Sequence, residues 1–233
     1  MEKGYDWKVS FFVFYSSRLA SIGMVEGISK TSKILDVGCG NGDLLFILRD
    51  IGFRNLLGVD PFIERDIVDN GVTILKRTIH ELPGTQKFNL IMFHHSFEHL
   101  PDQLETLKKA KQLLADNGTI LIRMPVKSDE IWKKYGVNWV QIDAPRHVIV
   151  HTVRSFEILS EKAGLKINKI IFDSTAFQFW GSELYKRGIP LEIGRRNLKK
   201  YFSYKQIKKW EKVAKELNKA QSGDQAIFYL KKR

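Results

Sequence analysis

Short apolar runs alternate with helically spaced apolar positions along most of the chain. The runs predict seven buried strands, which cover residues 34–37, 56–59, 72–75, 88–93, 119–124, 165–172 and 226–230. Between them, apolar residues recur with the spacing of a helix over 44–48, 102–114 and 153–163. Strands that alternate with helices are typical of an α/β protein with a doubly wound, mostly parallel sheet and right-handed crossovers.

Three segments stand outside this alternation. Residues 1–30 predict a helical N-terminal cover, with apolar side chains at helical spacing between 5 and 28. Such a cover can lie over a ligand cleft or cap the sheet edge. Residues 127–151 and 173–222 are longer insertions, the second of which is helical and precedes the last strand. A length of 233 residues suits a single domain over 1–233 that carries these additions.

The turn after the first strand has glycine at every second position. Gly38, Gly40 and Gly42 let the backbone approach a ligand closely, and the next helix begins at this turn. The N–H groups at a helix N-terminus suit an anionic or carboxylate-bearing ligand. Asp60 ends the second strand about 20 residues later, where a carboxylate can accept hydrogen bonds from ribose hydroxyls. The pattern predicts a nucleoside-containing ligand.

A dinucleotide site is the competing interpretation of these glycines. Such a site has the pattern G-x-G-x-x-G, whereas here the third glycine comes one residue early and Asp43 stands in the sixth position. A carboxylate at the helix start would repel a pyrophosphate. Asp36, two residues before the first glycine, is a further difference.

The string Asp36-Val37-Gly38-Cys39-Gly40-Asn41-Gly42, followed by Gly58-Val59-Asp60, closely resembles the cofactor signature of class I S-adenosylmethionine-dependent methyltransferases of type 11/23. The resemblance covers about residues 30–172 and 222–232. It implies strand order 3-2-1-4-5-7-6 with the last strand antiparallel, and S-adenosylmethionine as cofactor with S-adenosylhomocysteine as product. The cofactor-binding residues that it implies are Asp36, Gly38, Cys39, Gly40, Asn41, Gly42, Asp60, Pro61, Phe62, Thr78, Ile79, His94 and His95.

The adenine side of this site departs from the family pattern. By resemblance, Phe62 would stack on the adenine ring, although it can also be a core residue. Many members of the family have an aspartate after the third strand, where this chain has Arg77-Thr78. The adenine contact would then fall to Thr78 and to the backbone of Ile79.

The loop after the fourth strand, His94 to Asp102, is rich in polar residues. In the family this loop bounds the methionine end of the cofactor and faces the acceptor. Its three histidines and Glu98 also suggest a metal. We predict no metal site, because no further ligands are obviously placed elsewhere in the sequence. Glu98 and His99 are interpreted mainly as structural, and His99 is also a candidate for acceptor contact.

Both insertions, residues 127–151 and 173–222, are predicted to lie on the acceptor side. The Asp143-Ala144-Pro145-Arg146-His147 string of the first insertion resembles an element of methyltransferases from surface-polysaccharide and natural-product pathways. His147 is the first candidate for a general base, and His95 is the second. Arg146 can bind an anionic group of the acceptor, which Tyr135 and Trp139 would also contact. The alternative is a loop ordered by an Asp143–Arg146 pair with a buried histidine.

The net charge of +12 is concentrated near the C-terminus, where residues 186–233 hold 15 Lys or Arg against 4 acidic residues. Residues 203–219 predict a basic amphipathic helix, which can lie on an anionic membrane, follow a phosphate backbone, or pack its apolar stripe on the domain.

The single cysteine, Cys39, excludes an intramolecular disulfide and fits a reducing compartment. With no signal peptide or spanning helix visible, we expect a cytoplasmic protein that can associate peripherally with a membrane.

The sequence therefore predicts a methyltransferase for a small-molecule, glycan or lipid-linked acceptor, with O-methylation favoured. One alternative is methylation of RNA or tRNA through the basic C-terminal region, although no added RNA-binding domain is visible. A second alternative is a non-catalytic module that binds S-adenosylmethionine. The oligomeric state is left open.

Overall fold

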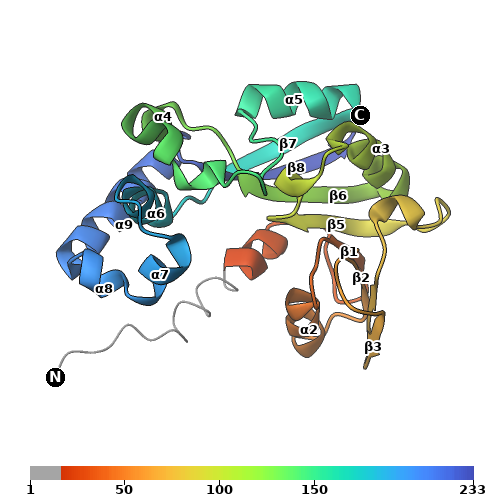
Figure 1. Cartoon of the computed structure of the whole chain (residues 1–233). Coiled ribbons are helices and arrows are strands. Elements are labelled where there is room, and N and C mark those ends of the chain that lie inside the picture. The colour runs from red at the N-terminus through yellow and green to blue at the C-terminus, as the bar shows by residue number, and fades with distance from the viewer. Residues whose placement is uncertain (1–16) are drawn as a thin grey trace.

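The computed structural model of the chain describes residues 17–233, which form one sheet flanked by helices and joined to a helical lobe (Figure 1). The sheet has eight strands in the order β3-β4-β2-β1-β5-β6-β8-β7. Their bounds are β1 Lys33–Val37, β2 Asn55–Val59, β3 Ile67–Asp69, β4 Val72–Leu75, β5 Phe88–His94, β6 Leu114–Pro125, β7 Leu165–Phe172 and β8 Gln225–Lys232.

The predicted strand order is confirmed. β4, β2, β1, β5 and β6 pair in parallel, and β8 lies antiparallel between β6 and β7. The additional strand is β3, a short edge strand that pairs antiparallel with β4. A second difference is at residues 116–118, between the helix predicted to end at 114 and the strand predicted to begin at 119. They belong to the beginning of β6, next to a register shift between Phe88 and Leu90 of β5.

Helices cover both faces of the sheet. α3 (Gln103–Leu113) and α5 (Val153–Lys162) pack on one face, where Leu107, Ala110 and Phe156 join a core with β5, β6 and β8. α2 (Asp43–Asp50) packs on the other face together with a helical turn at residues 17–23. Figure 1 shows these two layers, so the doubly wound arrangement is confirmed.

The N-terminal cover can be described only from residue 17 onward. There Ile22 and Val25 are buried against the α2 side of the sheet, and the Tyr229 hydroxyl of β8 donates to the Ser21 carbonyl at 2.9 Å. The predicted apolar positions Phe11, Phe12 and Tyr15 lie outside the described residues.

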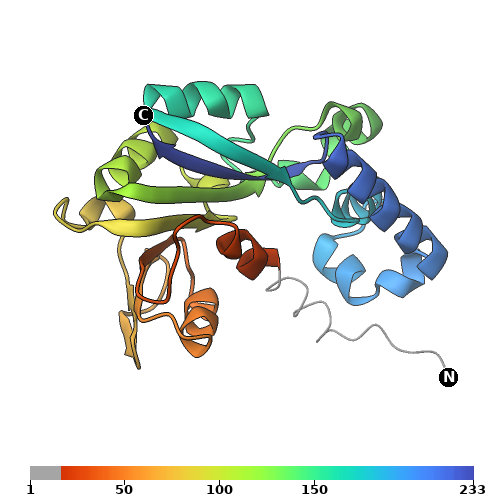
Figure 2. The same ribbon diagram turned by 180° about the vertical axis from the view of Figure 1, so that it is seen from behind.

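The two insertions form a single helical lobe, which we define as residues 127–151 and 173–222. Its α-helices are α4 Asp129–Tyr135, α6 Phe177–Lys186, α7 Leu191–Arg196, α8 Leu198–Tyr201 and α9 Tyr204–Lys219. Side chains from both insertions share one hydrophobic core, in which Ile131 and Trp139 meet Phe179 and Trp210. Figures 1 and 2 show the lobe beyond the ends of β6 and β7 from which the insertions depart.

Within residues 17–233, no helix is long and apolar enough to cross a bilayer.

Candidate active site

Asp60 is held in place at the C-terminal ends of β1 and β2 by two backbone groups. The Gly40 N–H donates to one carboxylate oxygen at 2.8 Å, and the Phe62 N–H donates to the other at 2.9 Å. Each oxygen keeps a further lone pair for an external donor. The carboxylate is therefore oriented before any ligand arrives, in the manner needed to accept from two ribose hydroxyls.

The glycine turn combines two crowded positions, Gly38 and Gly42, with an open one at Gly40. Gly38 has φ +73°, and a Cβ there would lie 2.4 Å from the Cβ of Ser96, whose hydroxyl donates to the Val37 carbonyl at 2.6 Å. Gly40 also has positive φ, but no atom lies within 4 Å of the place where its Cβ would be. The backbone at Gly40 thus faces open space beside Asp60, as a nucleoside-binding loop requires. Gly42, with φ +84°, begins α2.

The other side chains of the turn point in different directions. Asn41 is exposed, whereas the Cys39 sulfur packs over Gly58 of β2. Burial raises the pKa of the Cys39 thiol, so this side chain is a neutral packing group. Asp36 is buried in β1, and burial raises the pKa of its carboxyl group to about 7. The positive charge of Arg18 acts in the opposite direction, and Asp60 raises this pKa further.

The adenine side offers an exposed ring. Phe62 is 94% exposed, so it is not a core residue, and it lies next to the anchored Asp60. Pro61 is exposed as well. Thr78 begins a short 3₁₀ turn, η1 (Ile79–Glu81), and its hydroxyl and N–H both donate to Glu81, at 2.9 and 2.7 Å. The Thr78 oxygen therefore remains available only as an acceptor, and the side chain of Ile79 is buried.

Two histidines end β5 with different surroundings. Within residues 17–233, neither ring nitrogen of the buried His94 has a hydrogen-bond partner. Burial, followed by the positive charges of Arg18 and Arg123, lowers the pKa of His94 well below its usual value. His95 has a left-handed backbone with φ +55°, and its Nδ1 lies 3.3 Å from a carboxylate oxygen of Glu98.

The first insertion docks onto this loop. η2 (Phe97–His99) follows β5, and the Val148 N–H donates to the Glu98 carbonyl at 2.9 Å. His99 Nδ1 lies 2.8 Å from the Arg146 carbonyl oxygen, and the rings of His99 and His147 are 4.9 Å apart. The structure thus brings together two segments that were predicted separately to face the acceptor.

Arg146 itself points into solvent. Its guanidinium donates to Asp143 at 2.6 Å, which is the ordering ion pair weighed as the alternative in the sequence. The exposed Arg146 side chain is still accessible to an anionic group.

Tyr135 and Trp139 are not surface aromatics, as their insertion suggested. They are 5% and 2% exposed, and both belong to the core of the helical lobe. The Tyr135 hydroxyl donates to Glu183 at 3.1 Å, and Trp139 Nε1 donates to Asp224 at 2.9 Å. We therefore no longer assign either residue to acceptor binding.

The basic helix α9 uses its apolar stripe for folding. Trp210, Ala214 and Leu217 are buried against the lobe, whereas Lys208 and Lys212 are exposed. Because the stripe is already covered, α9 cannot insert an apolar face into lipid. Its exposed face is rich in lysines, of which Lys208 and Lys212 are paired with Glu211 and Glu216.

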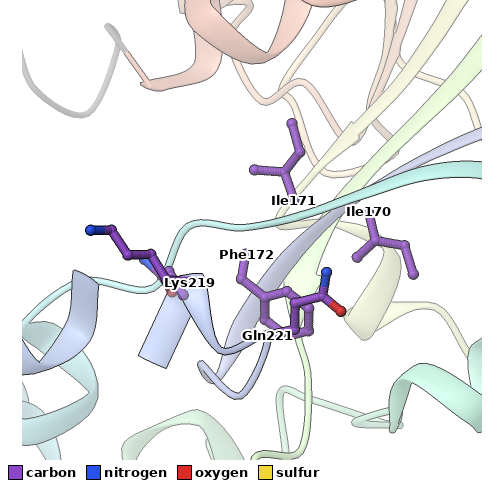
Figure 3. Close-up of a pocket in the computed structure, with 6 residues that line it drawn as sticks. Ile170, Ile171, Phe172, Lys219 and Gln221 are labelled. Atoms are coloured by element: carbon purple, nitrogen blue, oxygen red, sulfur yellow. The ribbon is translucent and has the colours of Figure 1, made fainter. Parts of the chain in front are cut away.

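A pocket of about 290 Å³ lies between the end of β7 and the end of α9 (Figure 3). It contains none of the predicted site residues. Its lining is Ile170, Ile171, Phe172, Asn218, Lys219 and Gln221.

An open α/β sheet with a glycine turn after its first strand and an anchored carboxylate after its second defines a class I methyltransferase fold with a site for S-adenosylmethionine. Residues 14–170 match the model of a methyltransferase-domain family, and the chain belongs to this family. The residues of the site fit the cofactor, since Asp60 can accept from its ribose and Phe62 can stack on its adenine.

Comparison with characterised proteins gives relatives that act on different acceptors. The chain is 29% identical over 104 residues to the ubiquinone biosynthesis O-methyltransferase of Haemophilus ducreyi. The aligned residues cover 39% of this chain and 44% of that protein. It is 25% identical over 186 residues to the tRNA U34 carboxymethyltransferase of Photobacterium profundum, and this alignment covers 72% of this chain and 52% of that protein. The chain thus spans about half the length of the curated relatives it matches.

Solved structures share the fold at low identity. A cyclopropane synthase from Mycobacterium tuberculosis superposes with a TM-score of 0.58 at 16% identity, over 92% of this chain and 82% of that one. A second mycolic acid cyclopropane synthase, solved with S-adenosylhomocysteine, gives a TM-score of 0.60 at 14% identity, over 93% and 83%.

Proposed function

We propose that the chain transfers the methyl group of S-adenosylmethionine to an oxygen atom of a small-molecule, glycan or lipid-linked acceptor. The observation that carries the proposal is the carboxylate of Asp60, anchored by the Gly40 and Phe62 N–H groups beside the open turn. The bound cofactor supplies a methyl group on a positively charged sulfur, which an acceptor atom attacks in line. The chain then has to hold both partners in line, exclude water and accept the proton of the acceptor hydroxyl.

His95 is our candidate for the base that accepts this proton. It follows β5 directly, next to Ser96, whose hydroxyl bonds the Val37 carbonyl at the glycine turn. Its left-handed backbone is an uncommon conformation of the kind that collects at functional sites. Glu98 lies 3.3 Å from Nδ1 and can orient the ring so that Nε2 faces the acceptor. His147 becomes the second candidate, because its side chain is 7% exposed whereas that of His95 is 25% exposed.

The experiment that tests the proposal is a calorimetric titration with S-adenosylmethionine. Loss of hydrogen bonds to a charged group costs about 1.5–3 kcal/mol, so Asp60→Ala should weaken binding by about 10- to 100-fold. Glu64→Ala is the matched control, since Glu64 is an exposed acid four residues away. Equal affinity of wild type and Asp60→Ala would contradict the cofactor site.

The base is tested by the release of S-adenosylhomocysteine when the protein is incubated with fractionated cell extract. We expect His95→Asn to lower turnover by about 10²- to 10⁴-fold while cofactor affinity stays the same. His80→Asn, at an exposed histidine, is the control. Full activity of His95→Asn would move the assignment to His147, and no release with any fraction would favour a non-catalytic module.

A second candidate acceptor is tRNA. It is supported by the similarity to tRNA U34 carboxymethyltransferases and by the exposed lysines of α9. Phosphate contacts make affinity fall steeply with salt. A filter-binding titration at several salt concentrations separates the candidates, because a small-molecule enzyme should show no salt-dependent affinity for tRNA.

A further inference from the structure

Three side chains from two distant segments converge on the loop after β5. Glu98 and His99 come from η2, and His147 comes from the first insertion of the lobe. One carboxylate oxygen of Glu98 and one ring nitrogen of each histidine lie within 4.8 Å of one another. The sequence alone predicts no metal site, because no further ligand is obviously placed to complete a shell. The position of His147 removes that reason.

Backbone carbonyls hold both histidines in the same tautomer. His99 Nδ1 lies 2.8 Å from the Arg146 oxygen, and His147 Nδ1 lies 2.7 Å from the Gln141 oxygen. A carbonyl oxygen can only accept, so in the neutral form of both rings Nδ1 carries the proton and Nε2 carries the lone pair. Metal-binding histidines commonly donate their other N–H to a backbone carbonyl, which fixes the ring for coordination.

Glu98 provides an oxygen that needs a partner. The side chain is 1% exposed, and one carboxylate oxygen faces His95 Nδ1 at 3.3 Å. The other oxygen, Oε2, has no hydrogen-bond partner within residues 17–233. A buried carboxylate oxygen without a partner is energetically costly, and a cation would satisfy it.

The surrounding charges also favour a cation. Asp143 Oδ2 lies 3.7 Å from His147 Nε2, while the other oxygen of Asp143 accepts from Arg146. Ligands of a Zn²⁺ ion lie about 2.0–2.2 Å from it, so two of them can be at most about 4.4 Å apart. The atoms of the cluster spread over up to 4.8 Å, so an ion at this site would draw its ligand side chains closer together.

We propose that Glu98 Oε2, His99 Nε2 and His147 Nε2 bind a divalent transition-metal ion, with Zn²⁺ as the representative ion. Two imidazoles and a carboxylate are a common donor set for such ions, and three protein ligands leave a coordination position open. The ion would join the first insertion to the end of β5, next to the cofactor cleft. That the open position accepts an oxygen of the acceptor rests on the proposed function, whereas metal binding itself does not.

The test uses the full chain, freed of metal with a chelator and titrated with ZnCl₂ in a calorimeter. We expect one ion per chain and an increase of the melting temperature on binding. His99→Gln and His147→Gln should each weaken binding by at least about 10- to 100-fold, since loss of a group that only hydrogen-bonds a metal ligand already has an effect of that size. His80→Gln, at an exposed histidine whose Nε2 lies 3.3 Å from the Thr106 hydroxyl, is the matched control and should bind like wild type.

His99→Gln keeps the test decisive even if changes at the more buried His147 impair folding, because His99 is exposed. Absence of stoichiometric Zn²⁺ binding would overturn the proposal. Unchanged affinity in His99→Gln, or equal loss in His80→Gln, would overturn it as well. None of these results depends on methyl transfer, so failure of this proposal and failure of the proposed function are distinguishable.

Discussion

The cofactor cleft and the helical lobe differ in how far apart in the sequence their contacting residues lie. In the cleft, Gly40 and the Asp60 carboxylate that it contacts are 20 residues apart. In the lobe, Trp139 and Asp224 are 85 residues apart, and Ser128 donates to the Ser222 carbonyl 94 residues away. A local motif can therefore fix the Asp60 carboxylate, whereas the acceptor side depends on which distant segments meet. We infer that cofactor use and acceptor choice can change independently in this fold.

The first prediction breaks the cleft at a crowded position of the glycine turn. Gly38→Ala places a Cβ 2.4 Å from the Cβ of Ser96 at a backbone with φ +73°. Overpacking and a left-handed non-glycine residue together should lower the free energy of unfolding by about 2–4 kcal/mol. Urea denaturation measures the change, and cofactor affinity should fall with it.

Two further variants serve as controls for Gly38→Ala. Gly23→Ala adds a methyl group where no atom lies within 4 Å, and should leave stability nearly unchanged. Combining Gly38→Ala with Ser96→Gly removes the clash but not the backbone strain. Ser96→Gly alone is the reference for the double variant, because it also removes the hydrogen bond to the Val37 carbonyl. Additive losses in the double variant would show that the backbone strain, and not the clash, causes the effect of Gly38→Ala.

The second prediction tests the junction between the lobe and the sheet. Asp224 precedes β8 and is buried against Trp139, and burial raises the pKa of its carboxyl group to about 7. The folded chain therefore binds a proton at this site between pH 3.8 and about 7 that the unfolded chain releases. The contribution of Asp224 to stability is complete below pH 3.8 and is lost as the pH rises to about 7.

Asp224→Asn removes this titration while its amide oxygen can still accept from Trp139 Nε1. The variant should gain stability relative to wild type as the pH rises from 5 to 8, by at least about 1 kcal/mol, since one pKa unit corresponds to about 1.4 kcal/mol. Urea denaturation at both values measures the gain, with the exposed Glu64→Gln as control. A difference that does not depend on pH would show that Asp224 is ionised in the folded chain.

The strands could be predicted from local patterns, and their order could be predicted from the family resemblance of the glycine turn and Asp60. The cofactor-binding residues stay a prediction, which rests on the same local motif. Leu35 and Val37 lie in an apolar run, and the glycines stand at a fixed distance from Asp60. The edge strand β3 was missed because it has no buried face, and Val68 in it is 78% exposed. The fit of Trp139 into the lobe core could not be predicted, since its partners belong to a second insertion.

The same reason explains the histidine cluster. The local sequence marked His99 and His147 as separate candidates but did not place them together. Two contacts between their segments, Val148 N–H to the Glu98 carbonyl and His99 Nδ1 to the Arg146 carbonyl, accompany a ring separation of 4.9 Å. Hydrophobic periodicity gives no signal for such a contact. A histidine and an acid in one loop, together with a second histidine in a nearby insertion, is the weak signal that was present.

The last prediction is the smallest and concerns the ligand side of the cleft alone. Phe62 is 94% exposed, so Phe62→Ala should change the free energy of unfolding by no more than about 0.5 kcal/mol. Aromatic stacking contributes about 0.5–1.5 kcal/mol, so the affinity for S-adenosylmethionine should fall by about 2- to 12-fold in a calorimetric titration. Val68→Ala, at another exposed apolar residue, should alter neither quantity. If affinity is unchanged in Phe62→Ala but lost in Asp60→Ala, the ribose is held as proposed and the adenine lies on a different surface. The short turn at Thr78 would then be the remaining candidate for adenine recognition, since its hydroxyl oxygen is still free to accept.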